Sequence, residues 1–97
     1  MLDHIAINVK DINESVDWYK SNFNTEVKYQ DETWAMLCVN GVNLALTISK
    51  QHPPHIAFKW HNPPPEDWKS HRDGSRYKYI EDPDGNTIEM VWWPNED

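Results

Sequence analysis

Alternating apolar and polar residues open the chain. In residues 3–9, the apolar side chains at every second position would share one face of a strand, and His4 is the first residue on the opposite face. This period of two is typical of a half-buried strand. Asp11 and Asn13 then offer N-cap oxygens, and apolar residues recur at spacings of four, three and four. This stripe predicts an amphipathic helix built on Ile12, Val16, Tyr19 and Phe23.

Three short strand candidates follow the helix. They cover residues 26–30, 33–40 and 42–49. Asn40-Gly41, between the last two, is typical of a tight hairpin because both residues tolerate positive φ. The first half of the chain is therefore expected to have the order β-α-β-β-β.

The second half begins with a strand over residues 55–60, directly after two prolines. Residues 63–67 place prolines before acidic side chains, as at a helix start, but Gly74 ends anything helical soon afterwards. We expect a short helix or a compact loop there. The chain closes with strands over residues 76–80 and 87–93, joined by the turn Asp82-Pro83-Asp84-Gly85.

A short internal repeat supports this division. His4-Ile5-Ala6-Ile7 matches His55-Ile56-Ala57-Phe58 at a separation of 51 residues. Both copies open a strand at the start of a half-chain, as two related β-α-β-β-β units require.

Composition and charge limit the kinds of molecule that the protein is expected to bind. The 97 residues are enough for one domain, and no apolar run approaches the roughly 18 residues that span a bilayer. A net charge of −7 disfavours nucleic acid and membrane surfaces, which leaves a small molecule or a protein. Cys38 is the single cysteine, so any metal must rely on imidazole and carboxylate. With no secretory pattern at the start, we expect a cytoplasmic protein.

Strand parity selects three candidate ligands. His4, His55 and Glu89 each lie opposite the bulky apolar side chains of their strand. If those bulky faces pack against helices, the three residues share the other face and form a two-histidine, one-carboxylate metal set. Each residue alone is more typical of solvated surface. The remaining histidines fall in expected loops and are interpreted as solvated: His52, His61 and His71.

Several segments resemble the vicinal oxygen chelate superfamily of glyoxalases, bleomycin resistance proteins and extradiol dioxygenases. Residues 3–9, with Trp18-Tyr19 behind them, are similar to its opening strand and helix, and residues 54–58 to its second opening. Residues 82–89 resemble the closing hairpin that ends in a metal-binding glutamate. The resemblance implies an α+β fold in one domain, residues 1–97. Two βαβββ modules, approximately 1–50 and 51–97, would form a cupped mixed sheet, with the second-module helix shortened.

The resemblance also implies site residues. The metal positions of the family fall on His4, His55 and Glu89, which parity had also selected. Tyr79 lies ten residues before Glu89, and similar spacing in extradiol dioxygenases and fosfomycin-modifying members puts a tyrosine in the site. Tyr79 and Glu89 are thus the candidate catalytic residues, Tyr79 as a hydrogen-bond donor to substrate or to an anionic intermediate. The alternative for Tyr79 is ordinary packing of a strand tyrosine.

Two positions depart from the family pattern. Ala45 occupies the position that often supplies a fourth ligand in glyoxalases and acyl-CoA epimerases, and alanine cannot coordinate. Ala6 stands where fosfomycin-type enzymes tend to carry threonine. Ala45 therefore favours a three-ligand site, as in the dioxygenase and fosfomycin-type branches, whereas Ala6 counts against the fosfomycin-type branch.

The leading hypothesis is a metal-dependent enzyme acting on a small oxygen-bearing substrate, either dioxygenase-like or a lyase or transferase that modifies a small molecule. Iron, manganese, zinc, nickel and cobalt all accept these ligands. The alternatives are a non-catalytic, bleomycin-resistance-type binding protein and a degenerate structural protein with too few loops to enclose a substrate.

A homodimer is expected because two small β-rich halves leave sheet edges and tryptophan surface to be covered. In such a dimer, the metal site would lie within one chain or combine His4 of one chain with His55 and Glu89 of the other.

Overall fold

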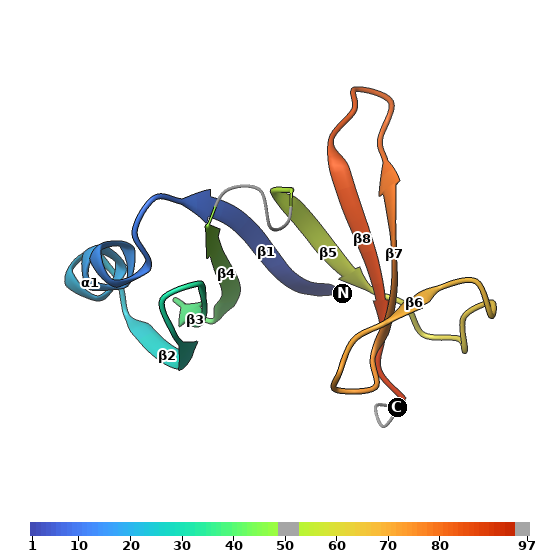
Figure 1. The fold of residues 1–97 in the computed structure, drawn as a ribbon, viewed down its shortest axis with the longest axis horizontal. Coiled ribbons are helices and arrows are strands. Elements are labelled where there is room, and N and C mark those ends of the chain that lie inside the picture. Colours follow the sequence, from blue (N-terminus) through green and yellow to red (C-terminus); the bar gives the residue numbers. More distant parts are fainter. Residues whose placement is uncertain (49–52, 95–97) are drawn as a thin grey trace. The chain divides into compact units, whose positions relative to one another are not determined.

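The computed structural model describes residues 1–48 and 53–94 (Figure 1). The expectation for His52 lies outside these residues. The chain divides into two compact units, which we call the N-terminal unit, residues 4–54, and the C-terminal unit, residues 1–3 with 55–97. The elements are β1 (Leu2–Val9), α1 (Ile12–Asn22), β2 (Thr25–Gln30), β3 (Trp34–Val39), β4 (Val42–Ile48), β5 (His55–Lys59), β6 (Lys69–Ser70), β7 (Arg76–Glu81) and β8 (Thr87–Trp92).

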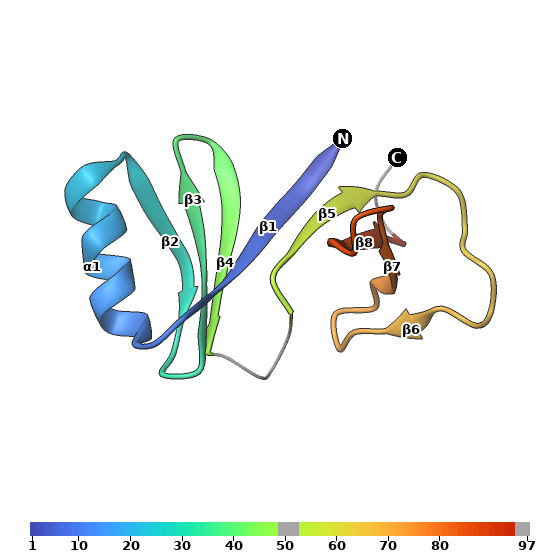
Figure 2. The ribbon, with the colours of Figure 1, turned by 90° about the horizontal axis from the view of Figure 1, so that it is seen from above.

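Helix α1 covers one face of the strands of the N-terminal unit (Figure 2). The strands run in the order β2-β3-β4-β1, with β1 parallel to β4 and the other pairs antiparallel. Asp11 caps the helix by accepting a hydrogen bond from the backbone of Glu14 at 2.9 Å. The expected apolar stripe of the helix packs in a core made by Ile12, Val16, Ala35, Leu37 and Leu46.

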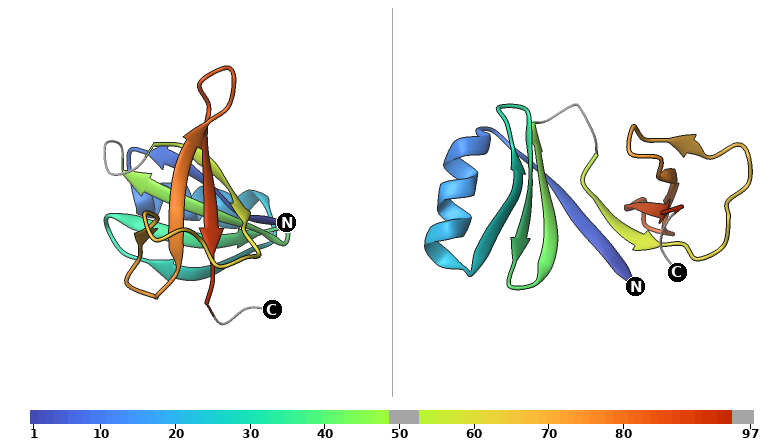
Figure 3. Two further views of the ribbon diagram at one scale, coloured as in Figure 1. Left: turned by 90° about the vertical axis from the view of Figure 1, so that its right-hand side faces the viewer. Right: turned by 90° about the horizontal axis from the view of Figure 1, so that it is seen from below.

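The C-terminal unit is built on the parallel pair β5–β8. Its strands follow the order β5-β8-β7-β6, and β7 and β8 form an antiparallel hairpin (Figure 3). The Asp82 carboxylate closes the hairpin turn by accepting hydrogen bonds from the backbone N–H groups of Asp84 and Asn86. Gly85 has a φ of 84°, which favours glycine, as the sequence predicted for this turn.

The first residues of β1 are anchored in the C-terminal unit. The carbonyl of Met1 accepts a 2.8 Å hydrogen bond from the backbone N–H of Lys59. The Asp3 carboxylate accepts a 2.9 Å hydrogen bond from the indole of Trp93. Strand β1 therefore begins in one unit and continues as the first element of the other.

The expected α+β fold with mixed strand pairing is confirmed, and the shortening of the second helix is extreme. Among the described residues, the segment between β5 and β6 contains turns and no helix. The Arg76 guanidinium holds this segment by donating to the carbonyls of Pro65 and Trp68 at 2.8 and 3.3 Å. No helix in the described part of the chain is long and apolar enough to cross a membrane. That the whole chain forms one domain stays a prediction.

The missing helix changes the apolar face of β5. Ile56 and Phe58, on the bulky face of β5, are 40% and 44% exposed. In the N-terminal unit, Ile7 occupies the place in the repeat that Phe58 holds here, and it packs against the α1 core. The condition that the bulky faces pack against helices is therefore not met on β5, because the segment between β5 and β6 forms turns, as the compact-loop alternative predicted.

Candidate metal centre

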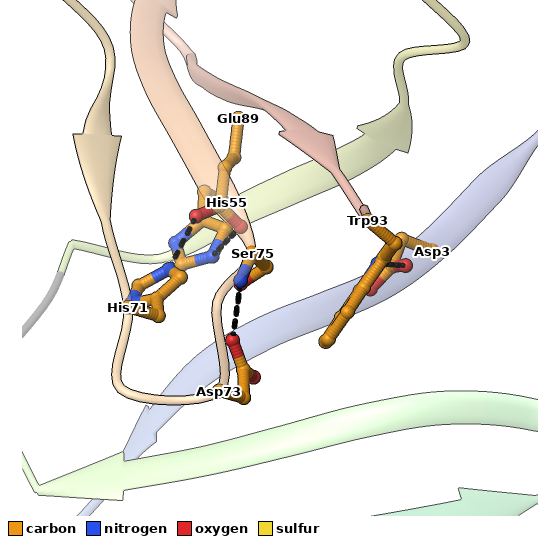
Figure 4. A network of polar contacts seen from close by, with 7 residues as sticks. All are labelled: Asp3, His55, His71, Asp73, Ser75, Glu89 and Trp93. Atoms are coloured by element: carbon orange, nitrogen blue, oxygen red, sulfur yellow. Dashed lines mark hydrogen bonds and ion pairs between the residues drawn. The ribbon is translucent and has the colours of Figure 1, made fainter. Parts of the chain in front are cut away.

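A histidine and a glutamate meet inside the C-terminal unit. Parallel pairing sets Glu89 of β8 beside Ala57 of β5, and His55 lies two residues earlier on the same face of β5. Both side chains are almost fully buried, and His55 Nε2 lies 3.4 Å from Glu89 Oε1 (Figure 4). The strand pairing thus brings together two of the three expected ligands.

The separation of these two atoms fits a shared cation. A direct N–H···O hydrogen bond is about 2.7 to 3.2 Å long, shorter than the 3.4 Å observed. Two donors that bind one tetrahedral cation at about 2.1 Å lie about 3.4 Å from one another. Burial of a carboxylate costs free energy unless opposite charge or hydrogen bonds compensate it. Residues and spacing therefore suit a divalent metal, which would be held by one imidazole nitrogen and one carboxylate oxygen here.

Tyr79 lies beside this pair. It is directly opposite Glu89 in the antiparallel pairing of β7 with β8, and its ring meets that of His55 edge-on at 5.2 Å between centroids. Burial raises the pKa of the Tyr79 phenol far above its usual value, and the charges of Glu89 and Tyr77 add to this shift. The phenol therefore stays protonated through the physiological range, so it can donate a hydrogen bond but does not serve as a phenolate base.

His71 also reaches the pair, which corrects its interpretation as a solvated loop histidine. Its Nε2 lies 3.6 Å from Glu89 Oε2, and its side chain is 37% exposed. Figure 4 shows the two oxygens of Glu89 directed toward two different imidazoles, those of His55 and His71. Parity could not identify this residue, because it lies in the loop between β6 and β7 rather than in a strand. His61 is exposed, as expected.

The remaining expected ligand, His4, is the first residue of the N-terminal unit. It is partly buried and follows Asp3 by one peptide bond. Two residues further along β1, Ala6 pairs with Ala45 of β4, and both are buried. Ala45, the alanine at the position where some relatives carry a fourth ligand, thus pairs with another small residue and offers no donor atom.

Comparison with known proteins identifies the family. The family model described as Glyoxalase/Bleomycin resistance protein/Dioxygenase superfamily matches residues 1–67, which include His4 and His55 but end before Tyr79 and Glu89. A search of curated proteins found no match.

Solved structures share the fold at low sequence identity. A glyoxalase/bleomycin resistance protein/dioxygenase superfamily member from Vibrio splendidus 12B01 is 18% identical, with a TM-score of 0.68 over 96% of this chain and 100% of that chain. Methylmalonyl-CoA epimerase from Streptomyces coelicolor is 21% identical, with a TM-score of 0.66 and 96% of each chain covered.

A third structure is much longer. Homoprotocatechuate 2,3-dioxygenase from B. fuscum is 18% identical, with a TM-score of 0.62 over 93% of this chain but 32% of that chain. These likenesses concern the fold, whereas the family model covers more than half of the sequence. The chain belongs to the glyoxalase, bleomycin resistance protein and dioxygenase superfamily.

Proposed function

We propose that the protein is a metal-dependent enzyme of this superfamily, in which His4, His55 and Glu89 bind one divalent metal. The observation that carries the proposal is the buried His55–Glu89 pair at 3.4 Å, a spacing suited to a shared cation. The substrate would be a small oxygen-bearing molecule. The reaction would be dioxygenase-like or that of a lyase or transferase, and iron, manganese, zinc, nickel and cobalt all suit the donors.

Chain connectivity supports the participation of His4. Met1 and Asp3 are tied to Lys59 and Trp93 of the C-terminal unit, and the Cα of His4 follows that of Asp3 at about 3.8 Å. Side chains of successive strand residues point to opposite faces. His4 is therefore directed away from the side on which Asp3 binds Trp93.

The chain's own residues would divide the chemistry between them. When bound, the metal would supply Lewis acidity to two neighbouring substrate oxygens. His55 and Glu89 hold their donor atoms inside the C-terminal unit, where burial excludes water. Tyr79, protonated and adjacent to Glu89, would donate a hydrogen bond to negative charge that develops on the substrate.

Replacing Glu89 by Gln removes one charged oxygen while preserving size. We expect the affinity for Co(II) or Zn(II) to fall at least about 100-fold, because loss of a direct ligand costs no less than loss of a group that orients one. Titration calorimetry of chelator-treated protein measures this change. Glu81→Gln, at an exposed glutamate of β7, is the matched control and should bind like the wild type. Equal affinities of both variants would refute the site.

Tyr79→Phe should leave metal affinity unchanged and lower turnover about 100-fold or more, because only the donated proton is lost. Turnover is measured on metal-loaded protein against catechols and α-hydroxycarbonyl compounds, from pH 6 to 9. Tyr29→Phe, at an exposed tyrosine of the N-terminal unit, is the control. Full activity of Tyr79→Phe would contradict a catalytic role for the phenol and leave Tyr79 with a packing role.

The bleomycin-resistance-type alternative gives the opposite pattern in these assays. A sequestering protein would bind a small ligand with the same affinity before and after chelator treatment, and it would turn over none of the substrates. That result would favour a ligand-binding function over an enzymatic one.

We also propose a homodimer formed through the uncovered apolar face of β5 and its neighbours. Ile56, Phe58 and Ile80 are each at least 40% exposed, and the strand pairing puts them on one face of β5, β8 and β7. A second copy is the proposed cover, because related domains bury such sheet surface by pairing and the described segment between β5 and β6 forms no helix.

Phe58→Glu should therefore dissociate the dimer without unfolding the chain, since a charge on this face opposes burial between copies. Sedimentation velocity at micromolar concentration should give twice the 11.5 kDa chain mass for the wild type and the single mass for the variant. Val42→Glu, at a 40% exposed valine of the N-terminal unit, should remain dimeric. A monomeric wild type would contradict the proposal.

A further inference from the structure

We propose that His71 is a positioning residue for the Glu89 ligand. It would hold oxygen Oε2 of that carboxylate, so that Glu89 binds the metal through Oε1 alone. The inference rests on the proposed metal site and adds to it a residue from a loop. It bears on the substrate, because a carboxylate bound through one oxygen occupies one coordination position and a carboxylate bound through both occupies two.

The two oxygens of Glu89 face different partners. His55 Nε2 lies 3.4 Å from Oε1, whereas His71 Nε2 lies 3.6 Å from Oε2 (Figure 4). Among the described side chains, His71 is not close enough to His55 and Glu89 together to share one ion with them. The proposed cation therefore belongs with His55 on the Oε1 side, and His71 acts on it only through the carboxylate.

A proton on Nε2 makes His71 a donor toward Oε2. The distance of 3.6 Å exceeds that of a hydrogen bond, which is about 2.7 to 3.2 Å, and a movement of about 0.4 Å closes the difference. Hydrogen bonds within a site often tighten when its ligand binds. The Glu89 side chain is almost fully buried, and the low local dielectric strengthens the interaction. The donated bond competes with the metal for Oε2 and fixes the orientation of the carboxylate.

The loop that carries His71 is held by its own hydrogen bonds. The backbone N–H of His71 donates to the carbonyl of Ser75 at 2.9 Å, and that of Gly74 donates to the carbonyl of His71 at 3.1 Å. The Asp73 carboxylate accepts from the backbone and the hydroxyl of Ser75 at 2.8 and 2.6 Å, and Ser75 is fully buried. Gly74 has a φ of 90°, which permits this tight turn. His71 is therefore fixed at its backbone despite lying in a loop.

Ring stacking fixes the orientation of the imidazole. The ring of His71 lies flat on that of Tyr77, with 3.9 Å between centroids and 10° between planes. Tyr77 belongs to β7, the strand that also places Tyr79 opposite Glu89. Tilting the imidazole away from Glu89 would break this stack. Backbone hydrogen bonds and stacking together pre-organise Nε2, as is required of a group that orients a metal ligand.

Binding of Glu89 through one oxygen keeps coordination positions open. With His4 included, the three proposed ligands occupy three positions of an octahedral metal and leave three. Two of these suit the neighbouring oxygens of a chelating substrate, and the third suits a further small reactant. Only two positions would be left if both oxygens of Glu89 bound. His71 thereby favours oxygenation or addition, which need a second reactant, over isomerisation of a single chelated substrate.

Infrared difference spectra between Zn(II)-loaded and chelator-treated wild type test the binding mode without any variant at His71. The antisymmetric and symmetric stretching bands of a carboxylate lie further apart when one oxygen binds a metal than when both do. We expect the wide separation for Glu89, whose bands are identified by their loss in Glu89→Gln. A narrow separation in the wild type would contradict the role of His71.

His71→Phe keeps a ring to stack on Tyr77 but lacks the donor, which leaves both oxygens of Glu89 available to the metal. We expect the band separation to narrow and the Zn(II) affinity, measured by titration calorimetry, to fall about 10-fold because the carboxylate is no longer oriented. His71→Gln keeps an N–H donor and should retain the wide separation. His61→Phe, at an exposed histidine of the same unit, is the matched control and should behave like the wild type.

Two results with the variants would overturn the inference and leave the proposed metal site intact. One is an unchanged spectrum and affinity in His71→Phe. The other is an equal loss of affinity in His71→Phe and His71→Gln with the wide separation retained in both, which would give His71 a structural role only. Absence of Zn(II) binding to the wild type would overturn the site and the inference together.

Discussion

The burial of the Glu89 carboxylate against the imidazole of His55 is the constraint on which the C-terminal unit depends. An ionised carboxylate removed from water is costly, and it is tolerated when cations or donors surround it. Here the groups around it come from three places: β5 contributes His55, β7 contributes Tyr79 and the β6–β7 loop contributes His71. The same side chains can serve a reaction, since imidazole and carboxylate groups bind metals and a protonated phenol donates hydrogen bonds.

The backbone produces this arrangement through two strand pairings. The parallel register of β5 and β8 sets His55 and Glu89 on one face, and the antiparallel register of β7 and β8 puts Tyr79 directly opposite Glu89. The same alternation turns Ile56 and Phe58 to the other face, where they are exposed. The polar site and the uncovered apolar surface are therefore two consequences of one sheet, so a change of register would disturb both.

Local patterns were sufficient to predict most of the fold. Alternation predicted the principal strands, and the glycine-containing turns predicted both hairpins, because these features depend on neighbouring residues. Helix α1 followed from its apolar stripe and the Asp11 cap. The region ahead of β6 was harder, since prolines before acidic residues suit a helix start as well as the turns that the Arg76 guanidinium holds in place.

The site could be predicted only where it lies on strands. Parity identified His55 and Glu89, whose pairing is observed, and His4, whose participation stays a proposal. His71 was missed because a loop has no period from which to infer direction. Its orientation depends on stacking with Tyr77 and on the turn closed by Asp73, contacts between side chains that a sequence pattern does not encode. The exposure of Phe58 could not be predicted for a similar reason, because the sequence left a short helix and a compact loop as alternatives between β5 and β6, and the described segment forms turns.

The most direct test of the metal centre is anomalous diffraction from crystals of the protein loaded with Co(II), collected on both sides of the cobalt absorption edge. We expect one strong anomalous peak about 2.0 to 2.3 Å from His55 Nε2 and from a carboxylate oxygen of Glu89. A peak bound only by exposed carboxylates elsewhere, with His55 and Glu89 still 3.4 Å apart and no peak between them, would contradict the assignment.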